Sequence, residues 1–204
     1  TMDILPRVVD AALRTHLQVM PAVVLTGARQ TGKSTLVERL FPARRYQTLD
    51  DLDVLDAARR DPELLVGGDA PVTLDEVQRA PDLLLAVKRA IDIGRRPGRF
   101  LLTGSANLLL MQRVSESLAG RASYLVLRPM TRREQRGEGR PGRWGELLEV
   151  PETDWAEFLA TEAGAPPGDW QGLAIRGGYP TPALEMGTAA QRAIWFDGYV
   201  RTYL

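Results

Sequence analysis

Cysteine is absent from the 204 residues of this chain, and histidine occurs only once, at His16. The absence of cysteine excludes disulfide bonds, thiolate nucleophiles and cysteine-ligated metal sites. His16 lies in a polar stretch that is predicted to be helical, which favours a surface histidine over a metal ligand or a catalytic base. A Ser-His-Asp triad therefore finds no support in this sequence.

Lysine is scarce as well: Lys33 and Lys88 are the only lysines among 26 basic residues, and 26 acidic residues balance that charge. A domain that binds nucleic-acid backbones non-specifically is usually more basic than this. No apolar run approaches the roughly 20 residues of a membrane-spanning helix, and we find no secretory leader. We therefore expect a cytoplasmic protein with no membrane partner, and the scarcity of lysine draws attention to Lys33.

Lys33 lies in a segment that fits the phosphate-binding pattern G-x-x-x-x-G-K-[ST] at every fixed position. The segment consists of Gly27, Ala28, Arg29, Gln30, Thr31, Gly32, Lys33 and Ser34, and Thr35 follows it. An apolar run over 22–26 predicts a buried strand before it, and a helix is predicted over 33–41. The backbone N–H groups of such a turn and the start of the helix converge on one anion.

We predict that residues 27–35 bind the phosphates of a nucleotide. Lys33 is expected to contact the β- and γ-phosphates, and the Ser34 hydroxyl is expected to bind Mg²⁺. The alternative interpretation is an ordinary glycine turn between a strand and a helix.

A second signature of a nucleotide site ends the apolar strand predicted over 72–76. We expect Asp75 to hold Mg²⁺ through its waters and Glu76 to deprotonate the attacking water. In the alternative interpretation the two acids cap the next loop or pair with arginine. The adjacent acids favour ATP hydrolysis over phosphoryl transfer to a metabolite, and the lack of an N-K-x-D motif favours ATP over GTP.

Hydroxyl side chains end the next predicted strand, 100–103. We choose Ser105, with Thr103 second, as a sensor that would contact the γ-phosphate or the attacking water. In the alternative interpretation Ser105 or Asn107 caps the helix predicted at about 107–118.

Arg121 precedes the last predicted strand, 124–127. An arginine here would reach the γ-phosphate of a neighbouring subunit and stabilise the charge of the transition state, which implies a homo-oligomer. The alternative is a surface arginine that pairs with an acid.

Strands alternate with helices over residues 1–128, which predicts a parallel sheet covered by helices. The other elements predicted in this part are a helix over 3–17, a strand over 46–49, a helix capped by Asp50, a short helix from Pro62 and a helix over 81–93. After Pro129 the strand signals stop, and helices at about 153–163, 169–176 and 188–204 predict a helical subdomain over 129–204. The last helix is aromatic and has no stop signal, so we expect that more chain follows it or that a partner covers it.

A cluster of arginines lies at the start of that subdomain, at Arg132, Arg133, Arg136, Arg140 and Arg143. It is the one basic patch that would suit nucleic acid. A solvated loop is the commoner meaning of such a cluster.

Several of these segments recur together in one known family. The segments are Gly27 to Ser34, Leu49 to Asp51, Leu74 to Pro81, Leu102 to Asn107, Leu118 to Arg121 and Gly177 to Pro180. In this order they resemble the prokaryotic AAA-like P-loop ATPases whose full-length members carry a C-terminal domain of unknown function with a nuclease-like core. The resemblance implies an α/β P-loop NTPase three-layer sandwich with a parallel five-stranded sheet of order 5-1-4-3-2, together with Mg²⁺ and ATP.

The combined signatures predict a protein that hydrolyses ATP to ADP and phosphate with Mg²⁺, as a motor or a switch. Two alternatives stay open. One is a nucleotide-gated signalling or defence switch that holds ATP or ADP and turns over slowly. The other is the ATPase module of a protein that processes nucleic acid.

Overall fold

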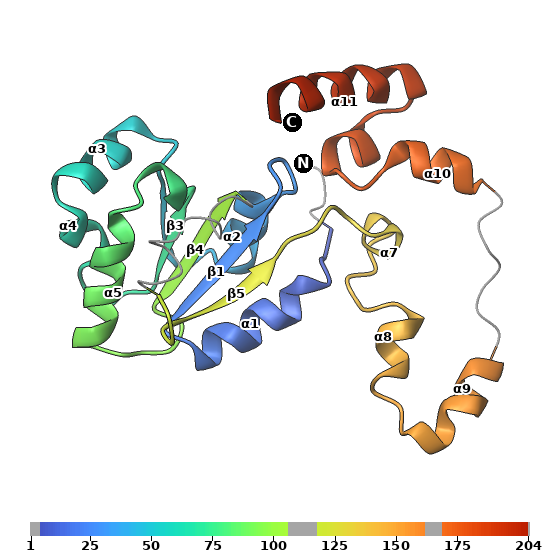
Figure 1. The fold of residues 1–204 in the computed structure, drawn as a ribbon, viewed down its shortest axis with the longest axis horizontal. Coiled ribbons are helices and arrows are strands. Elements are labelled where there is room, and N and C mark those ends of the chain that lie inside the picture. Colours follow the sequence, from blue (N-terminus) through green and yellow to red (C-terminus); the bar gives the residue numbers. More distant parts are fainter. Residues whose placement is uncertain (1–4, 106–117, 162–168, 204) are drawn as a thin grey trace. The chain divides into compact units, whose positions relative to one another are not determined.

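The computed structural model describes residues 5–105, 118–161 and 169–203 (Figure 1). The chain divides into two compact units. The first unit is Val9–Arg128, and the second unit contains residues up to Val8 together with residues from Pro129 onward. The helix expected over 107–118 lies almost entirely outside the described residues.

The first unit is built on five parallel strands. The strands are β1 (Ala22–Gly27), β2 (Arg45–Thr48), β3 (Val72–Asp75), β4 (Phe100–Ser105) and β5 (Ala122–Val126). Their order across the sheet is β2-β3-β4-β1-β5, so the predicted order 5-1-4-3-2 is confirmed. The last strand begins two residues earlier than we predicted.

Helices cover both faces of this sheet (Figure 1). The helices of the first unit are α1 (Val9–Val19), α2 (Lys33–Leu40), α3 (Leu52–Arg60), α4 (Pro62–Val66) and α5 (Leu83–Ile93). Successive residues of a strand point to opposite faces, so Val24 joins one apolar cluster and Val23 joins the other. Every residue of β1 is buried. The result is the three-layer sandwich expected from the alternation of strands and helices.

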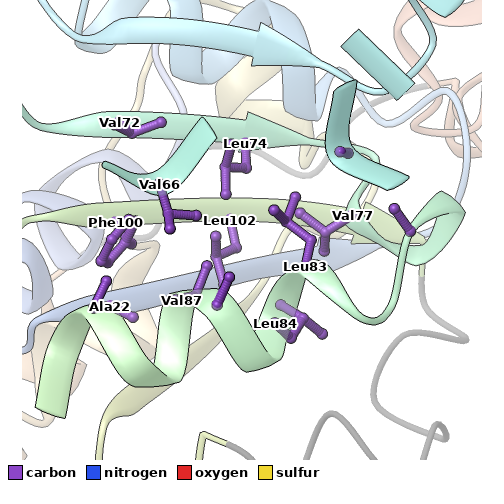
Figure 2. Close-up of a cluster of buried hydrophobic side chains, with 14 of the residues drawn as sticks. Ala22, Val66, Val72, Leu74, Val77, Leu83, Leu84, Val87, Phe100 and Leu102 are labelled. Atoms are coloured by element: carbon purple, nitrogen blue, oxygen red, sulfur yellow. The ribbon is translucent and has the colours of Figure 1, made fainter. Parts of the chain in front are cut away.

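The larger apolar cluster lies between the sheet and helices α3, α4 and α5. Figure 2 shows Leu74 and Leu102 of the sheet beside Leu83 and Val87 of α5. The smaller cluster joins Leu13 of α1 and other side chains of α1 and α2 to the opposite face. Burial of these side chains on both faces fixes the register of the strands, and hence the positions of the loops at their ends.

Two details of the helix predictions are wrong. The helix expected over 3–17 is α1, Val9–Val19, because Val8 donates its backbone N–H to the Glu134 carboxylate at 2.7 Å and is drawn out of the helix. Asp51, not Asp50, caps α3 by accepting from the backbone N–H of Asp53 at 2.8 Å. Asp50 instead pairs with Arg79.

The regular elements described in the second unit are all helices. Its elements are α7 (Arg132–Gln135), α8 (Arg143–Leu147), η3 (Glu152–Asp154), α9 (Trp155–Ala160), α10 (Trp170–Arg176), η4 (Thr181–Glu185) and α11 (Ala189–Tyr203). The buried Glu134 carboxylate accepts from Arg7 Nε at 3.1 Å and from the backbone N–H of Thr131 at 2.6 Å. Although burial acts in the opposite direction, these hydrogen bonds, the one from Val8 and the charge of Arg7 hold the pKa of Glu134 below its ordinary value.

Across the described ranges, no helix combines the length and the apolar character that crossing a membrane requires.

Candidate functional site

The predicted nucleotide residues gather where the central strands of the first unit end. Gly27 of β1 pairs in register with Ser105 of β4, and Thr48 of β2 pairs with Asp75 of β3. In a parallel sheet all these positions lie at the carboxyl edge, where the loops of α/β proteins bind ligands. The sheet therefore brings the phosphate loop, the two acids and the hydroxyls of β4 to one edge.

Two glycines of the loop hold backbone shapes that a side chain would block. Gly27 has φ 154°, and a Cβ at this position would lie 2.3 Å from the carbonyl oxygen of Leu127. Gly32 has φ 89° and directly precedes α2. The loop is also tied internally, because Thr31 Oγ1 donates to the Ala28 carbonyl at 2.9 Å. The two glycines and this hydrogen bond together define the shape of the loop.

Lys33 is folded back onto its own loop. Its Nζ donates to the carbonyls of Gly27 at 3.2 Å and Ala28 at 3.0 Å, and the residue is only 5% exposed. Burial lowers the pKa of Lys33, while the charges of Glu76 and Asp75 act in the opposite direction.

Asp75 is surrounded by hydroxyl groups. Its Oδ2 accepts from Ser34 at 2.9 Å and from Tyr46 at 2.8 Å, with Thr48 at 3.4 Å, and its Oδ1 accepts from Thr103. The residue is only 3% exposed, so these hydrogen bonds stabilise a carboxylate that water barely reaches. Burial, followed by the hydrogen bond to Asp75 and its charge, raises the pKa of the Tyr46 phenol.

Sequence reasoning missed Tyr46 and Thr48. Both belong to β2, the strand next to β3, and residues two apart in a strand point to the same face. The strand order places β2 beside β3, but the contacts of this polar pair with Asp75 also depend on the register of the two strands.

A hydroxyl and a carboxylate oxygen 2.9 Å apart, at Ser34 and Asp75, fit the oxygen chemistry of Mg²⁺. Among the residues that the structure describes, no cluster of three or more acidic or histidine side chains could hold a metal ion by itself. Mg²⁺ usually takes one or two protein oxygens and completes its shell with water and phosphate, so the donor set is compatible with that arrangement.

Glu76 follows β3 with a left-handed backbone, φ 57°, which is uncommon for a residue other than glycine. Its backbone N–H donates to Thr103 Oγ1 at 3.3 Å, and its carboxylate accepts from the side-chain amide of Gln78. Such strained conformations are often found at functional sites.

The two hydroxyls of β4 lie differently. Thr103 is fully buried and its hydroxyl contacts both Asp75 and the N–H of Glu76. Ser105 is half-buried and its backbone N–H donates to Gln78 at 3.3 Å. The helix that Ser105 or Asn107 would cap in the alternative interpretation lies almost entirely outside the described residues.

Arg121 lies at the opposite, amino edge of the sheet. Its carbonyl accepts from the backbone N–H of Ala22 at the start of β1, and its side chain pairs with Asp92 at 2.6 Å. The length of β1 puts about 17 Å between this edge and the phosphate loop. Arg121 therefore does not reach the loop of its own subunit, and its action on a neighbouring subunit stays a prediction.

The arginine cluster of the second unit is partly engaged within that unit. Arg133 pairs with Glu138 at 3.0 Å, and Arg143 donates to the carbonyl of Leu159 at 3.0 Å and lies over the ring of Phe158. These contacts assign at least two of the five arginines a structural role.

Comparison with known proteins identifies the family of this chain and two relatives. A family model described as an AAA domain matches residues 20–135. Two uncharacterised proteins, from Mycobacterium bovis and Mycobacterium tuberculosis, are each 33% identical over 196 residues, which is 95% of this chain. The chain spans only 37% of the length of these relatives.

Among solved structures, a Walker-type ATPase of Pyrococcus abyssi superposes with a TM-score of 0.55 at 15% identity. The match covers 98% of this chain and 77% of the other. At this identity the likeness extends to the fold alone.

Proposed function

The chain belongs to the AAA-domain family of P-loop ATPases, and from this premise we propose that it binds ATP with Mg²⁺ and hydrolyses it to ADP and phosphate. The observation that carries the proposal is the convergence of three groups at one edge of the sheet. These groups are the ammonium of Lys33, the linked Ser34 and Asp75, and the carboxylate of Glu76.

Each group has one task in this proposal. The backbone N–H groups of residues 27–35 bind the phosphates, and Lys33 exchanges its two carbonyl acceptors for phosphate oxygens. Ser34 and Asp75 hold Mg²⁺, which when bound neutralises charge on the phosphate oxygens. Glu76 orients a water molecule and accepts its proton.

The contacts that these groups make with one another and with their neighbours also favour the slow switch as a second candidate. Lys33 is satisfied by its own loop, Asp75 accepts from four hydroxyls, and Glu76 is held by a neighbouring amide. Each contact must be exchanged or adjusted for turnover, so we expect a low basal rate. The nucleic-acid module stays a weaker proposal, since part of its arginine cluster is engaged internally.

The first experiment exploits the two lysines of the chain. Lys33→Ala should abolish both binding of a fluorescent ATP analogue and release of phosphate, whereas Lys88→Ala, on an exposed face of α5 beside Asp92, should leave both unchanged. Equal binding by the two variants contradicts the proposal.

The arginine finger and the homo-oligomer are tested by mixing inactive variants. Lys33→Ala lacks a working loop and keeps Arg121, whereas Arg121→Ala keeps the loop and lacks the finger. If Arg121 acts between subunits, the mixture should recover part of the turnover that each variant has lost. A mixture that is no more active than its components would contradict the proposed action of Arg121 on a neighbouring subunit.

A further inference from the structure

Gln78 lies in a short, well-anchored turn between Glu76 and α5. The turn is the 3₁₀ helix η1 (Val77–Arg79), in which the backbone N–H of Arg79 donates to the Glu76 carbonyl at 3.0 Å. Val77 is fully buried in the larger apolar cluster, and the side chain of Arg79 pairs with Asp50. These contacts of the two neighbouring residues fix the backbone position of Gln78.

Both ends of the Gln78 amide have partners. Its Nε2 donates to the carboxylate of Glu76, and its Oε1 accepts the backbone N–H of Ser105 at 3.3 Å. A carboxylate can only accept and a backbone N–H can only donate, so the two partners define which way the amide points. Gln78 therefore links the residue after β3 to the last residue of β4.

We propose that Gln78 is a positioning residue that fixes the Glu76 carboxylate relative to the end of β4. This inference rests on the proposed role of Glu76 as the general base. A glutamate side chain has three rotatable bonds, and the hydrogen bond from Gln78 selects one arrangement of its carboxylate. The hydrogen bond from the Ser105 backbone N–H favours one position of the other end of the amide.

Two other groups already fix the backbone of Glu76. Its N–H donates to Thr103, and its carbonyl accepts from Arg79. The carboxylate, in contrast, has Gln78 as the hydrogen-bond partner that the structure describes. Loss of the Gln78 amide should thus disturb where the base points, with little effect on the phosphate loop, whose contacts involve other residues.

The test uses two substitutions of Gln78 with different consequences. Gln78→Met keeps the length of the side chain and removes both hydrogen bonds. Gln78→Glu keeps an acceptor for Ser105 and replaces the donor to Glu76 by a like charge. Gln18→Met, on the exposed face of α1, is the matched control.

Both Gln78 variants should lower kcat about 10- to 100-fold, because misplacement of a reacting group by about 1 Å is enough for such a loss. Their KM and their affinity for a fluorescent ATP analogue should stay within about twofold of the wild type. The reason is that the substitutions leave the residues proposed to bind the nucleotide unchanged. In a Glu76→Gln background, Gln78→Met should cause no further loss of kcat, because it acts through Glu76.

A wild-type kcat in Gln78→Glu and Gln78→Met overturns the inference and leaves the proposed ATPase standing. If Gln78→Met lowers kcat further in the Glu76→Gln background, the inference is overturned as well, because the effect of Gln78 would then not act through the Glu76 carboxylate. If the wild-type protein binds ATP but releases no phosphate, the proposed hydrolysis fails and this inference fails with it.

Discussion

The two edges of the parallel sheet each contain a partly or fully buried cation, and the two cations have different sets of hydrogen-bond acceptors. At the amino edge, Arg44 donates to the Thr73 hydroxyl and to the carbonyls of Val72, Gly98 and Arg99 at 2.7 to 3.1 Å. Burial lowers its pKa to about 10, so its charge is retained at neutral pH. At the carboxyl edge, Lys33 donates to two carbonyls of the phosphate loop, those of Gly27 and Ala28.

This difference distinguishes a cation that links two strands, Arg44, from a cation that is held by one loop, Lys33. The acceptors of Arg44 come from the starts of β3 and β4 and lock those strands together, and no ligand chemistry would replace them. In the proposed function, phosphate, Mg²⁺ or water replaces some of the hydrogen bonds among the groups of the carboxyl edge. The contacts of Arg44 and the proposed nucleotide site thus lie at opposite edges of the same sheet.

The largest effect should come from Asp75 at the carboxyl edge. Asp75→Asn retains the volume but not the negative charge, so Mg²⁺-dependent turnover should fall at least about 100-fold. Phosphate release over a titration of Mg²⁺ measures this loss. Turnover that is unchanged at saturating Mg²⁺ would remove Asp75 from the metal site.

A paired substitution compares the two edges directly. Arg44→Met leaves several buried acceptors without a donor and should lower the free energy of unfolding by about 3 kcal/mol. Lys33→Met removes a partly desolvated charge and should change it by less than about 1 kcal/mol, although nucleotide binding is lost. Urea denaturation of both variants measures the contrast, and equal losses of stability would refute the distinction between the edges.

The smallest effect concerns Tyr46, which joins an outer strand to Asp75. Tyr46→Phe removes one hydrogen bond and should lower the free energy of unfolding by about 1 kcal/mol at neutral pH. The pKa of Tyr46 in the folded protein lies above its ordinary value of 10.0. The contribution of the Tyr46 phenol to the free energy of unfolding is therefore fully present below pH 10. It is lost as the pH rises above 10, because the phenol of the unfolded chain releases its proton at a lower pH than the phenol of the folded protein.

Unfolding measured between pH 8 and pH 11 checks this sign. The wild type should lose stability above pH 10 more steeply than Tyr46→Phe does. Tyr124→Phe is the control, since burial raises the pKa of that phenol without a described carboxylate partner. Parallel curves for wild type and Tyr46→Phe would show that the phenol does not stabilise Asp75.

The sheet order and the phosphate loop could be predicted because their signals are local or come from a recognisable set of motifs. Gly27, Gly32 and Lys33 stand at fixed spacing, and apolar runs mark the strands. The surroundings of Asp75 could not be predicted in the same way. Tyr46 contacts it only because β2 lies beside β3, and that contact depends on the register of two strands distant in sequence.

The same reason explains the other errors and omissions. Asp50 and Asp51 are equally good caps by residue type, and the pairing of Asp50 with Arg79 decides between them. The start of α1 depends on Glu134, more than a hundred residues away. Gln78 lies in the recurring segment Leu74 to Pro81, but its contact with Ser105 depends on the pairing of strands distant in sequence.

Phosphate release by Glu76→Gln, measured together with its affinity for ATP, tests the central claim most directly. The account predicts that this variant binds ATP and Mg²⁺ as tightly as the wild type and hydrolyses ATP at least about 100-fold more slowly, because a general base contributes at least that factor. Hydrolysis by Glu76→Gln at the wild-type rate, or a wild-type protein that binds no ATP at millimolar concentration, would contradict it.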